Sequence, residues 1–152
     1  MKTEHQQRIE KMMDKMGQDV PAHPTIPDEG TRLLRAKLIM EEALETVRAL
    51  GFSPHVTTGI IDEDALFFRS DGDADLVAIA DGCADISVVT IGTLSACGIS
   101  DNPILTEVDK NNLTKFGPGS YRREDGKWMK PPDFVGPDLV KVLKEQSGDS
   151  AC

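Results

Sequence analysis

Hydrophobic residues recur at three- and four-residue intervals in four stretches of the chain, and this spacing is typical of amphipathic α-helices. Glycines follow three of these stretches, at Gly17, Gly51 and Gly98, and glycine commonly ends a helix. The fourth begins with Asn102 as a cap and Pro103 in the first turn. The pattern predicts an all-α fold with helices over residues 3–17, 31–50, 74–97 and 102–115.

The second predicted helix is hydrophobic on two faces. Leu33, Met40 and Leu44 belong to an ordinary core stripe, whereas Leu34 and Leu38 lie on the opposite face. Acidic side chains lie among the residues of that second face. A solvated acidic surface is the alternative, but packing on two sides favours a protected groove. The carboxylates in question are Glu41 and Glu45.

The third predicted helix is the most apolar, and we expect it to be the most buried element. From Leu76 to Cys97 its only charges are Asp81 and Asp85. Its length and polarity resemble a membrane span, but two central aspartates without basic flanks favour the core of a soluble helix bundle. Buried aspartates are rare unless they are paired or bound to metal. A structural hydrogen-bonding role is the alternative for these two.

The remaining segments connect or end these helices. Residues 18–30 are a proline-containing connector, and residues 51–73 are expected to be irregular. Asp125-Gly126 predicts a tight hairpin between two short strands, followed by a short helix over 136–145. We therefore expect a single domain over residues 1–145 and a disordered tail over 146–152.

Composition narrows the functional classes. A net charge of −9 over 152 residues argues against sequence-independent nucleic-acid binding, which needs a basic face. The three cysteines form no even-numbered framework, and the polar N-terminus has no apolar signal core. A cytoplasmic protein with reduced thiols fits these features.

The acidic residues of the second and third helices form the main candidate site. Glu41, Glu42 and Glu45 lie within an arc of about 100°, and Asp81 and Asp85 are one turn apart. If the helices pack side by side, up to five carboxylates converge, and their repulsion requires a cation. Mg²⁺ is the simplest candidate, with Mn²⁺ possible, because both prefer oxygen ligands.

A second cluster provides candidate phosphate contacts. It lies at the end of the fourth helix, where lysines provide positive charge and asparagines provide amide donors. Its members are Lys110, Asn111, Asn112 and Lys115. The alternative is a solvated helix end stabilised by the helix dipole. Trp128 is a further candidate for stacking on a nucleobase, although aromatic residues in hairpins usually pack on the core.

Four stretches in this order resemble the all-α nucleoside triphosphate pyrophosphohydrolases, the MazG-like and phosphoribosyl-ATP pyrophosphohydrolase-like group. The resemblance covers residues 7–138, and its stretches are 34–45, 79–85, 107–115 and 125–132. One departure concerns the usual second motif, Glu-x-x-Asp. Gly82 stands where the motif has glutamate, and Asp81 lies one position earlier. If Asp81 substitutes for that glutamate, its shorter side chain leaves the number and position of the metal ions open.

The resemblance implies Mg²⁺-dependent hydrolysis of the α–β phosphate bond of a nucleoside triphosphate, with a dNTP as the first expectation. Glu41 would be the general base, although the sequence does not separate base from ligand, and Glu42, Glu45, Asp81 and Asp85 would hold metal. Substrate would be held by Arg35, Lys110, Asn111, Asn112, Lys115 and Trp128. It further implies a four-helix-bundle-type core completed in a homodimer or homotetramer. Phosphoribosyl-ATP as the substrate, or a non-catalytic helical module that binds a protein partner, are the alternatives.

Overall fold

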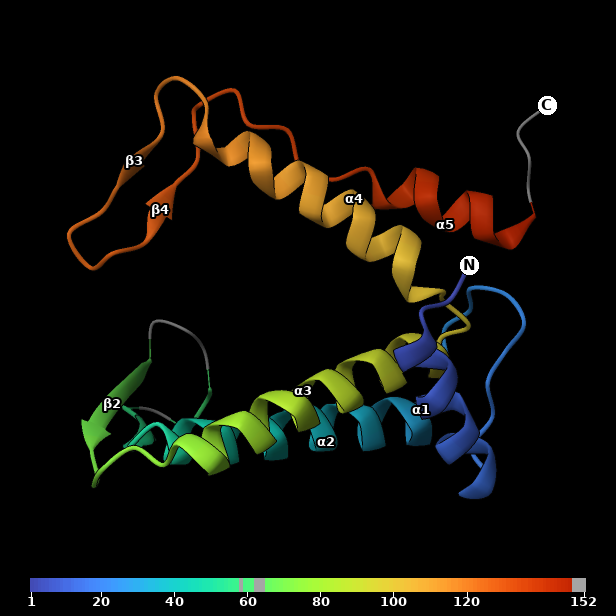
Figure 1. Ribbon diagram of the computed structural model, residues 1–152, viewed down its shortest axis with the longest axis horizontal. Helices are drawn as coiled ribbons and strands as arrows, with labels where there is room; N and C mark the ends of the chain where they lie inside the picture. The colour runs from blue at the N-terminus through green and yellow to red at the C-terminus, as the bar shows by residue number, and fades with distance from the viewer. Residues whose placement is uncertain (58, 62–64, 149–152) are drawn as a thin grey trace. The chain divides into compact units, whose positions relative to one another are not determined.

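The computed structural model describes residues 1–57, 59–61 and 65–148. Within these ranges the chain is mostly helical, as expected, with five α-helices and two small antiparallel hairpins (Figure 1). The helices are α1 (Glu4–Lys15), α2 (Glu29–Ala49), α3 (Leu76–Ala96), α4 (Asp101–Leu113) and α5 (Leu139–Ser147). The strands are β1 (Phe52–Val56), β2 (Leu66–Ser70), β3 (Tyr121–Arg122) and β4 (Trp128–Met129).

The chain divides into two compact units. The paired-helix unit comprises Ile26–Thr93, and the terminal unit comprises Met1–Thr25 together with Leu94–Cys152. In the paired-helix unit, α2 and α3 run antiparallel side by side, joined by the β1–β2 hairpin (Figure 1). Both acidic segments therefore belong to this unit.

The ends of α2 and α3 follow from local capping. Asp28 accepts a hydrogen bond from the Thr31 amide at 2.9 Å, and Asp75 accepts bonds from the amides of Val77 and Ala78. Gly51 follows α2 with a φ of 86°, a conformation that glycine adopts without strain. The expected positions of both helices are confirmed to within two residues.

Residues 51–73 correct the sequence-based expectation of an irregular segment. They contain the β1–β2 hairpin, in which His55 pairs with Phe67 and their rings stack 5.4 Å apart. Phe52 and Phe68, on the other face, are also exposed. Since neither face is fully buried, the segment lacks the apolar–polar alternation that would have revealed its strands.

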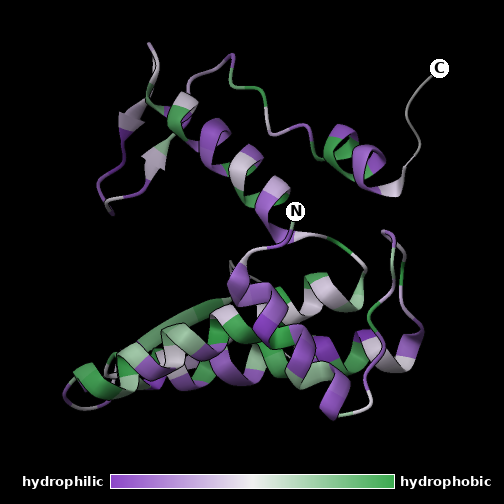
Figure 2. Ribbon diagram, turned by 45° about the vertical axis from the view of Figure 1, so that its right-hand side comes forward, coloured by the Kyte–Doolittle hydropathy of each residue, from purple (hydrophilic) through white to green (hydrophobic). Residues whose placement is uncertain are grey.

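Burial in the paired-helix unit also differs from expectation. The described residues of α2 include only two buried ones, Arg35 and Thr46, whereas the expected core residues Leu33 and Met40 are exposed. The first turns of α3 are exposed too; apart from Gly82, its buried residues lie in its second half, beginning near Val89. Hydrophobic residues nevertheless occur along both helices (Figure 2). One neighbouring helix is not enough to cover them.

The α3 helix meets the length and hydropathy criteria of a membrane span, as the core helices of soluble proteins also can. Asp81 and Asp85 lie within it.

The terminal unit is held by a buried polar network. The Gln6 side chain, completely buried, donates to Ser95 Oγ at 3.0 Å and to the Ile99 carbonyl at 2.7 Å, and it accepts from the Asp101 amide at 2.8 Å. Asp101 is also buried and accepts from the Thr3 amide. Gln6 and Asp101 therefore fix α1 against the α3–α4 junction, with Ile9 and Met13 of α1 buried in the same unit.

The fourth and fifth helices differ from prediction at their ends. The cap of α4 is Ser100 rather than Asn102, because Asp101 already begins the helix. The Ser100 amide donates a hydrogen bond to the side-chain oxygen of Gln146 at 2.7 Å. Gln146 lies in α5, which continues to Ser147 and so includes the first residues of the expected disordered tail. Residues 149–152 of that tail lie outside the described residues. The predicted Asp125-Gly126 hairpin is confirmed.

Candidate functional site

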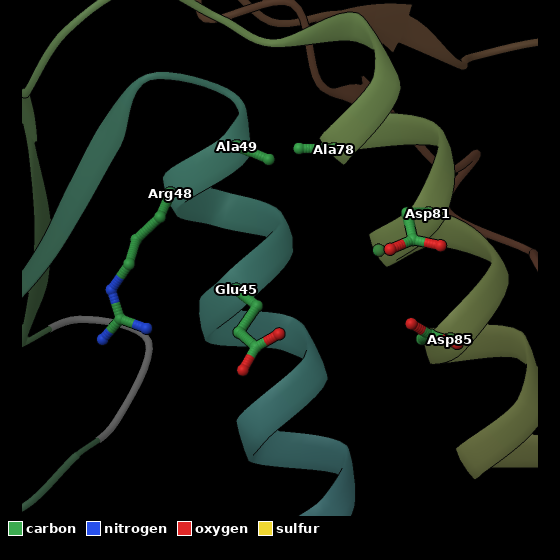
Figure 3. A pocket seen from close by; sticks show the side chains of 7 residues that line it. Glu45, Arg48, Ala49, Ala78, Asp81 and Asp85 are labelled. Carbon is green, nitrogen blue, oxygen red and sulfur yellow. The ribbon is translucent and has the colours of Figure 1, made fainter.

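A pocket of about 290 Å³ lies between α2 and α3, and carboxylates occupy both of its walls. Asp81 and Asp85 project from α3 toward α2, and Glu45 projects from the facing helix (Figure 3). The sequence-based expectation that the two acidic helices pack side by side is thus met within one unit. The lining residues are Glu45, Arg48, Ala49, Ala78, Asp81, Gly82 and Asp85.

Glu42 is electrostatically coupled to the other acids. Burial, followed by repulsion from the other four carboxylates, raises the pKa of the Glu42 carboxyl above its usual range. In decreasing order these are Asp85, Glu45, Glu41 and Asp81. Glu42 therefore experiences charges from both helices, as expected if the five acids form one site.

Close contact between the helices brings the acids together. A Cβ atom added to Gly82 would meet the Thr46 hydroxyl and lie 3.1 Å from its Cβ and 3.2 Å from its Cα. Thr46 Oγ1 donates to the Glu42 carbonyl at 2.7 Å, which keeps the side chain compact against α2. Only glycine permits this approach, so the residue that departs from the Glu-x-x-Asp motif has a packing role here.

The donors suit a hard divalent cation, because the site is rich in carboxylate oxygens and α2 and α3 place no histidine or thiolate in the lining. In the conformation described, however, no group of three or more acidic, histidine or cysteine side chains among the described residues is arranged to hold a metal ion. Glu41 and Glu45 are exposed, and exposed side chains change rotamer within nanoseconds. The chemistry of the donor set fits, while its final geometry requires side-chain rearrangement.

Arg48 is a pocket residue that the sequence analysis missed. Among the described residues of the lining it is the only cationic one, and it lies three positions after Glu45 on the same face of α2. In Figure 3 its side chain extends along the flank of α2 and away from α3. The spacing from Glu45 was the available sequence signal, but basic residues near a helix end are usually attributed to the helix dipole.

The predicted phosphate-binding residues belong to the terminal unit. Lys110 and Asn112 lie in the last turn of α4, and Lys115 lies in a short 3-10 helix, η1 (Thr114–Phe116). The carboxylates belong to the paired-helix unit. The predicted phosphate contacts and the predicted metal ligands therefore belong to different units.

Two of the predicted substrate contacts interact with other residues of the protein, and a third is buried. The Asn111 amide donates to the Val135 carbonyl at 2.7 Å, and the Trp128 indole donates to the Lys115 carbonyl at 3.2 Å. Trp128 also packs on Phe116, with ring centroids 5.3 Å apart. Arg35 is buried on α2, with 7% of its surface exposed. Asn111 and Trp128 thus make contacts within the terminal unit.

A protein-family model described as phosphoribosyl-ATP pyrophosphohydrolase matches residues 9–112. The match begins in α1 and extends to the last turn of α4, so it includes all five carboxylates as well as Lys110 and Asn112. It ends before Lys115 and Trp128. The chain matches no curated protein.

Proposed function

The chain belongs to the phosphoribosyl-ATP pyrophosphohydrolase family, within the MazG-like all-α nucleoside triphosphate pyrophosphohydrolase superfamily, and on that premise we propose that it hydrolyses the bond between the α- and β-phosphates of a nucleotide. Membership implies a hydrolase that releases pyrophosphate. The identity of the nucleotide and the dependence on metal are parts of the proposal.

Phosphoribosyl-ATP is the first substrate to test. From the sequence, a dNTP is the first expectation and phosphoribosyl-ATP the alternative, and the family match supports the alternative better. Both substrates present the same triphosphate to the enzyme. They differ in the base and sugar, so the chemistry proposed at the phosphates is common to the two.

The observation that carries the proposal is the pocket with carboxylates on both walls. Glu45 on α2 faces Asp81 and Asp85 on α3, and Glu42 is coupled to all three. A pocket this acidic repels a free triphosphate and accepts one only together with cations. This is the charge distribution expected of a site for a metal–nucleotide complex.

We propose that Glu42, Glu45, Asp81 and Asp85 hold Mg²⁺, with Mn²⁺ as a substitute, in keeping with their oxygen donors. When bound, the ion would neutralise phosphate charge and polarise the phosphoryl oxygens. Because Asp81 is shorter than the glutamate of the family motif and one position earlier, we leave the number of ions open.

The remaining steps use the protein's own side chains. Glu41, exposed on α2 next to Glu42, accepts a proton from the attacking water. The water oxygen forms a bond to the α-phosphorus while the bond from that phosphorus to the α–β bridging oxygen breaks. A nucleoside monophosphate and pyrophosphate leave. Lys110, Asn112 and Lys115 are proposed to hold the departing phosphates.

We also propose that the active protein is a homodimer or homotetramer. Large hydrophobic side chains of the paired-helix unit remain exposed in a single chain, among them Leu76 and Val77, each 80% exposed. A second pair of helices would cover them and complete a four-helix core. The exposed set also includes Leu33, Leu34 and Met40.

The test is release of pyrophosphate from phosphoribosyl-ATP and from each dNTP and NTP, with Mg²⁺, Mn²⁺ or chelator. We expect metal-dependent release that is lost in Glu42→Gln and Asp85→Asn. Glu124→Gln removes an exposed carboxylate outside the pocket and is the matched control. No product from any nucleotide, with wild type and variants alike, would contradict the proposal and favour the partner-binding module.

A further inference from the structure

Arg48 carries a positive charge, unlike the other described residues that line the acidic pocket. The pocket wall also includes three carboxylates, from Glu45, Asp81 and Asp85. Nevertheless, Arg48 makes no ion pair with any residue in the described part of the chain. An arginine beside carboxylates ordinarily pairs with one of them. Its guanidinium is therefore available for another anion.

Arg48 lies on the same face of α2 as two of the acidic residues. Glu41, Glu45 and Arg48 are spaced by four and three residues, so all three lie on one face of α2. About 4.5 Å of helical rise separates Arg48 from Glu45. An arginine side chain is long enough to span this distance, so the guanidinium can reach a phosphate bound near Glu45.

The positive charge of Arg48 complements the negative charge of the pocket when a phosphate binds. Carboxylates attract the metal but repel the substrate's phosphates, whereas a guanidinium does the opposite and can form two parallel hydrogen bonds to phosphate oxygens. Arg48 also belongs to the same unit as the carboxylates, unlike Lys110 and Lys115. It can therefore contribute to phosphate binding without any contribution from the terminal unit.

We infer that Arg48 binds a phosphate group of the metal–nucleotide complex at the acidic pocket. The inference rests on the proposed function for the identity of the ligand and extends it by one residue. In the structure the guanidinium extends along α2 and away from α3 (Figure 3). Binding therefore includes a rotamer change that directs it into the pocket, and an exposed side chain makes such a change readily.

Arg48 should weaken the binding of metal and strengthen the binding of phosphate. Its positive charge repels a divalent ion held by the neighbouring carboxylates and attracts a phosphate. Replacement by glutamine is therefore expected to leave Mn²⁺ binding unchanged or tighter while it weakens binding of the anion. A residue that only supported the carboxylates structurally would weaken both.

The experiment compares wild type, Arg48→Gln and Arg48→Lys in three measurements. These are titration of Mn²⁺ alone, titration of inorganic tripolyphosphate with Mn²⁺ present, and kcat/KM for the nucleotide that wild type hydrolyses. We expect Arg48→Gln to lower tripolyphosphate affinity and kcat/KM by about 10- to 100-fold, as for loss of a charged hydrogen bond, with a partial loss in Arg48→Lys. Arg32→Gln changes an exposed arginine of α2 outside the pocket and is the control.

Each contrary result has a distinct meaning. If Arg48→Gln keeps tripolyphosphate affinity and kcat/KM within twofold of wild type, the inference is wrong. If it loses Mn²⁺ binding together with activity, Arg48 acts through the carboxylates and the inference is again wrong. If wild type hydrolyses no nucleotide but binds tripolyphosphate in an Arg48-dependent way, the proposed function fails while the phosphate site stands.

Discussion

Gly82 of α3 lies directly against Thr46 of α2, and this contact sets the separation of the two helices that carry the acids. A side chain at Gly82 would have its Cβ atom 3.2 Å from the Thr46 Cα, which cannot move without moving the helix. The pocket lies at the same level of the helix pair, since Gly82 is among its lining residues. Separation of the helices and geometry of the site are thus linked.

Gly82→Ala should destabilise the protein by up to about 2 kcal/mol. Overpacking costs about 1 to 3 kcal/mol, and the better helix propensity of alanine, about 1 kcal/mol, only partly offsets it. Activity should fall by a larger factor than stability alone explains, because the carboxylates of α3 move away from those of α2. Chemical denaturation and kcat/KM measure the two effects.

A double-mutant cycle with Thr46→Ala provides the control for Gly82→Ala. Removing the Thr46 hydroxyl and methyl groups makes room for the new Cβ, so the double variant should be more stable than the sum of the single effects predicts. Additive effects would show that Gly82 and Thr46 do not constrain each other.

Divalent metal should raise the melting temperature of the folded protein. At a metal concentration 100 times the dissociation constant, binding stabilises by about 2.7 kcal/mol, or about 5 to 10 °C for a chain of this size. Asp85→Asn should reduce the shift strongly, whereas Glu124→Gln should not. A melting temperature indifferent to both Mg²⁺ and Mn²⁺ in wild type would contradict a metal site formed by these acids.

Glu42 should destabilise the metal-free protein at neutral pH. Its pKa is raised in the folded state, so between the unfolded and folded pKa values the folded protein binds more protons than the unfolded one. The stability contributed by protonated Glu42 is therefore present at low pH and is lost as the pH rises through this window. Glu42→Gln removes the ionisable group and with it this loss of stability.

We accordingly expect Glu42→Gln to melt higher than wild type in chelator at pH 7, and the difference to disappear below the pKa of an unperturbed glutamate. The same variant should gain less from added metal. Equal melting temperatures in chelator at all pH values would indicate that the other carboxylates do not act on Glu42.

Charges introduced on the exposed apolar residues should disrupt self-association. Val77→Glu and Leu34→Glu place a carboxylate on α3 and on α2, where burial against a second copy would leave it unpaired. We expect light scattering to report an oligomer for wild type and a smaller species for both variants. Val135→Glu, at a residue 78% exposed in the terminal unit, is the control. A monomeric wild type would contradict the oligomer.

Gln6→Leu should destabilise the protein by about 2 to 4 kcal/mol. The substitution keeps the side chain's approximate size but leaves the Asp101 amide and the Ile99 carbonyl without their partner. Gln7→Leu, one residue along but exposed, is the matched control. Denaturation by urea measures both, and equal midpoints would mean that the network contributes little to stability.

Local sequence determined the helices. Periodic hydrophobic residues placed all of them approximately, and Gly51 marked the end of α2 because caps act on amides and carbonyls only a few residues away. The spacing of Glu41, Glu42 and Glu45 likewise placed three acids on one arc of α2, since it depends only on the pitch of the helix. These features require no knowledge of the rest of the chain.

The tertiary structure alone decided which faces meet. The contact of Gly82 with Thr46 directs Asp81 and Asp85 toward α2, and it also places Arg48 in the pocket wall. The expectation from hydropathy is reversed on α2, where Leu33 and Met40 are exposed and Arg35 is buried. Side-chain burial depends on neighbours that are distant in sequence, and helical periodicity specifies a face without specifying what covers it.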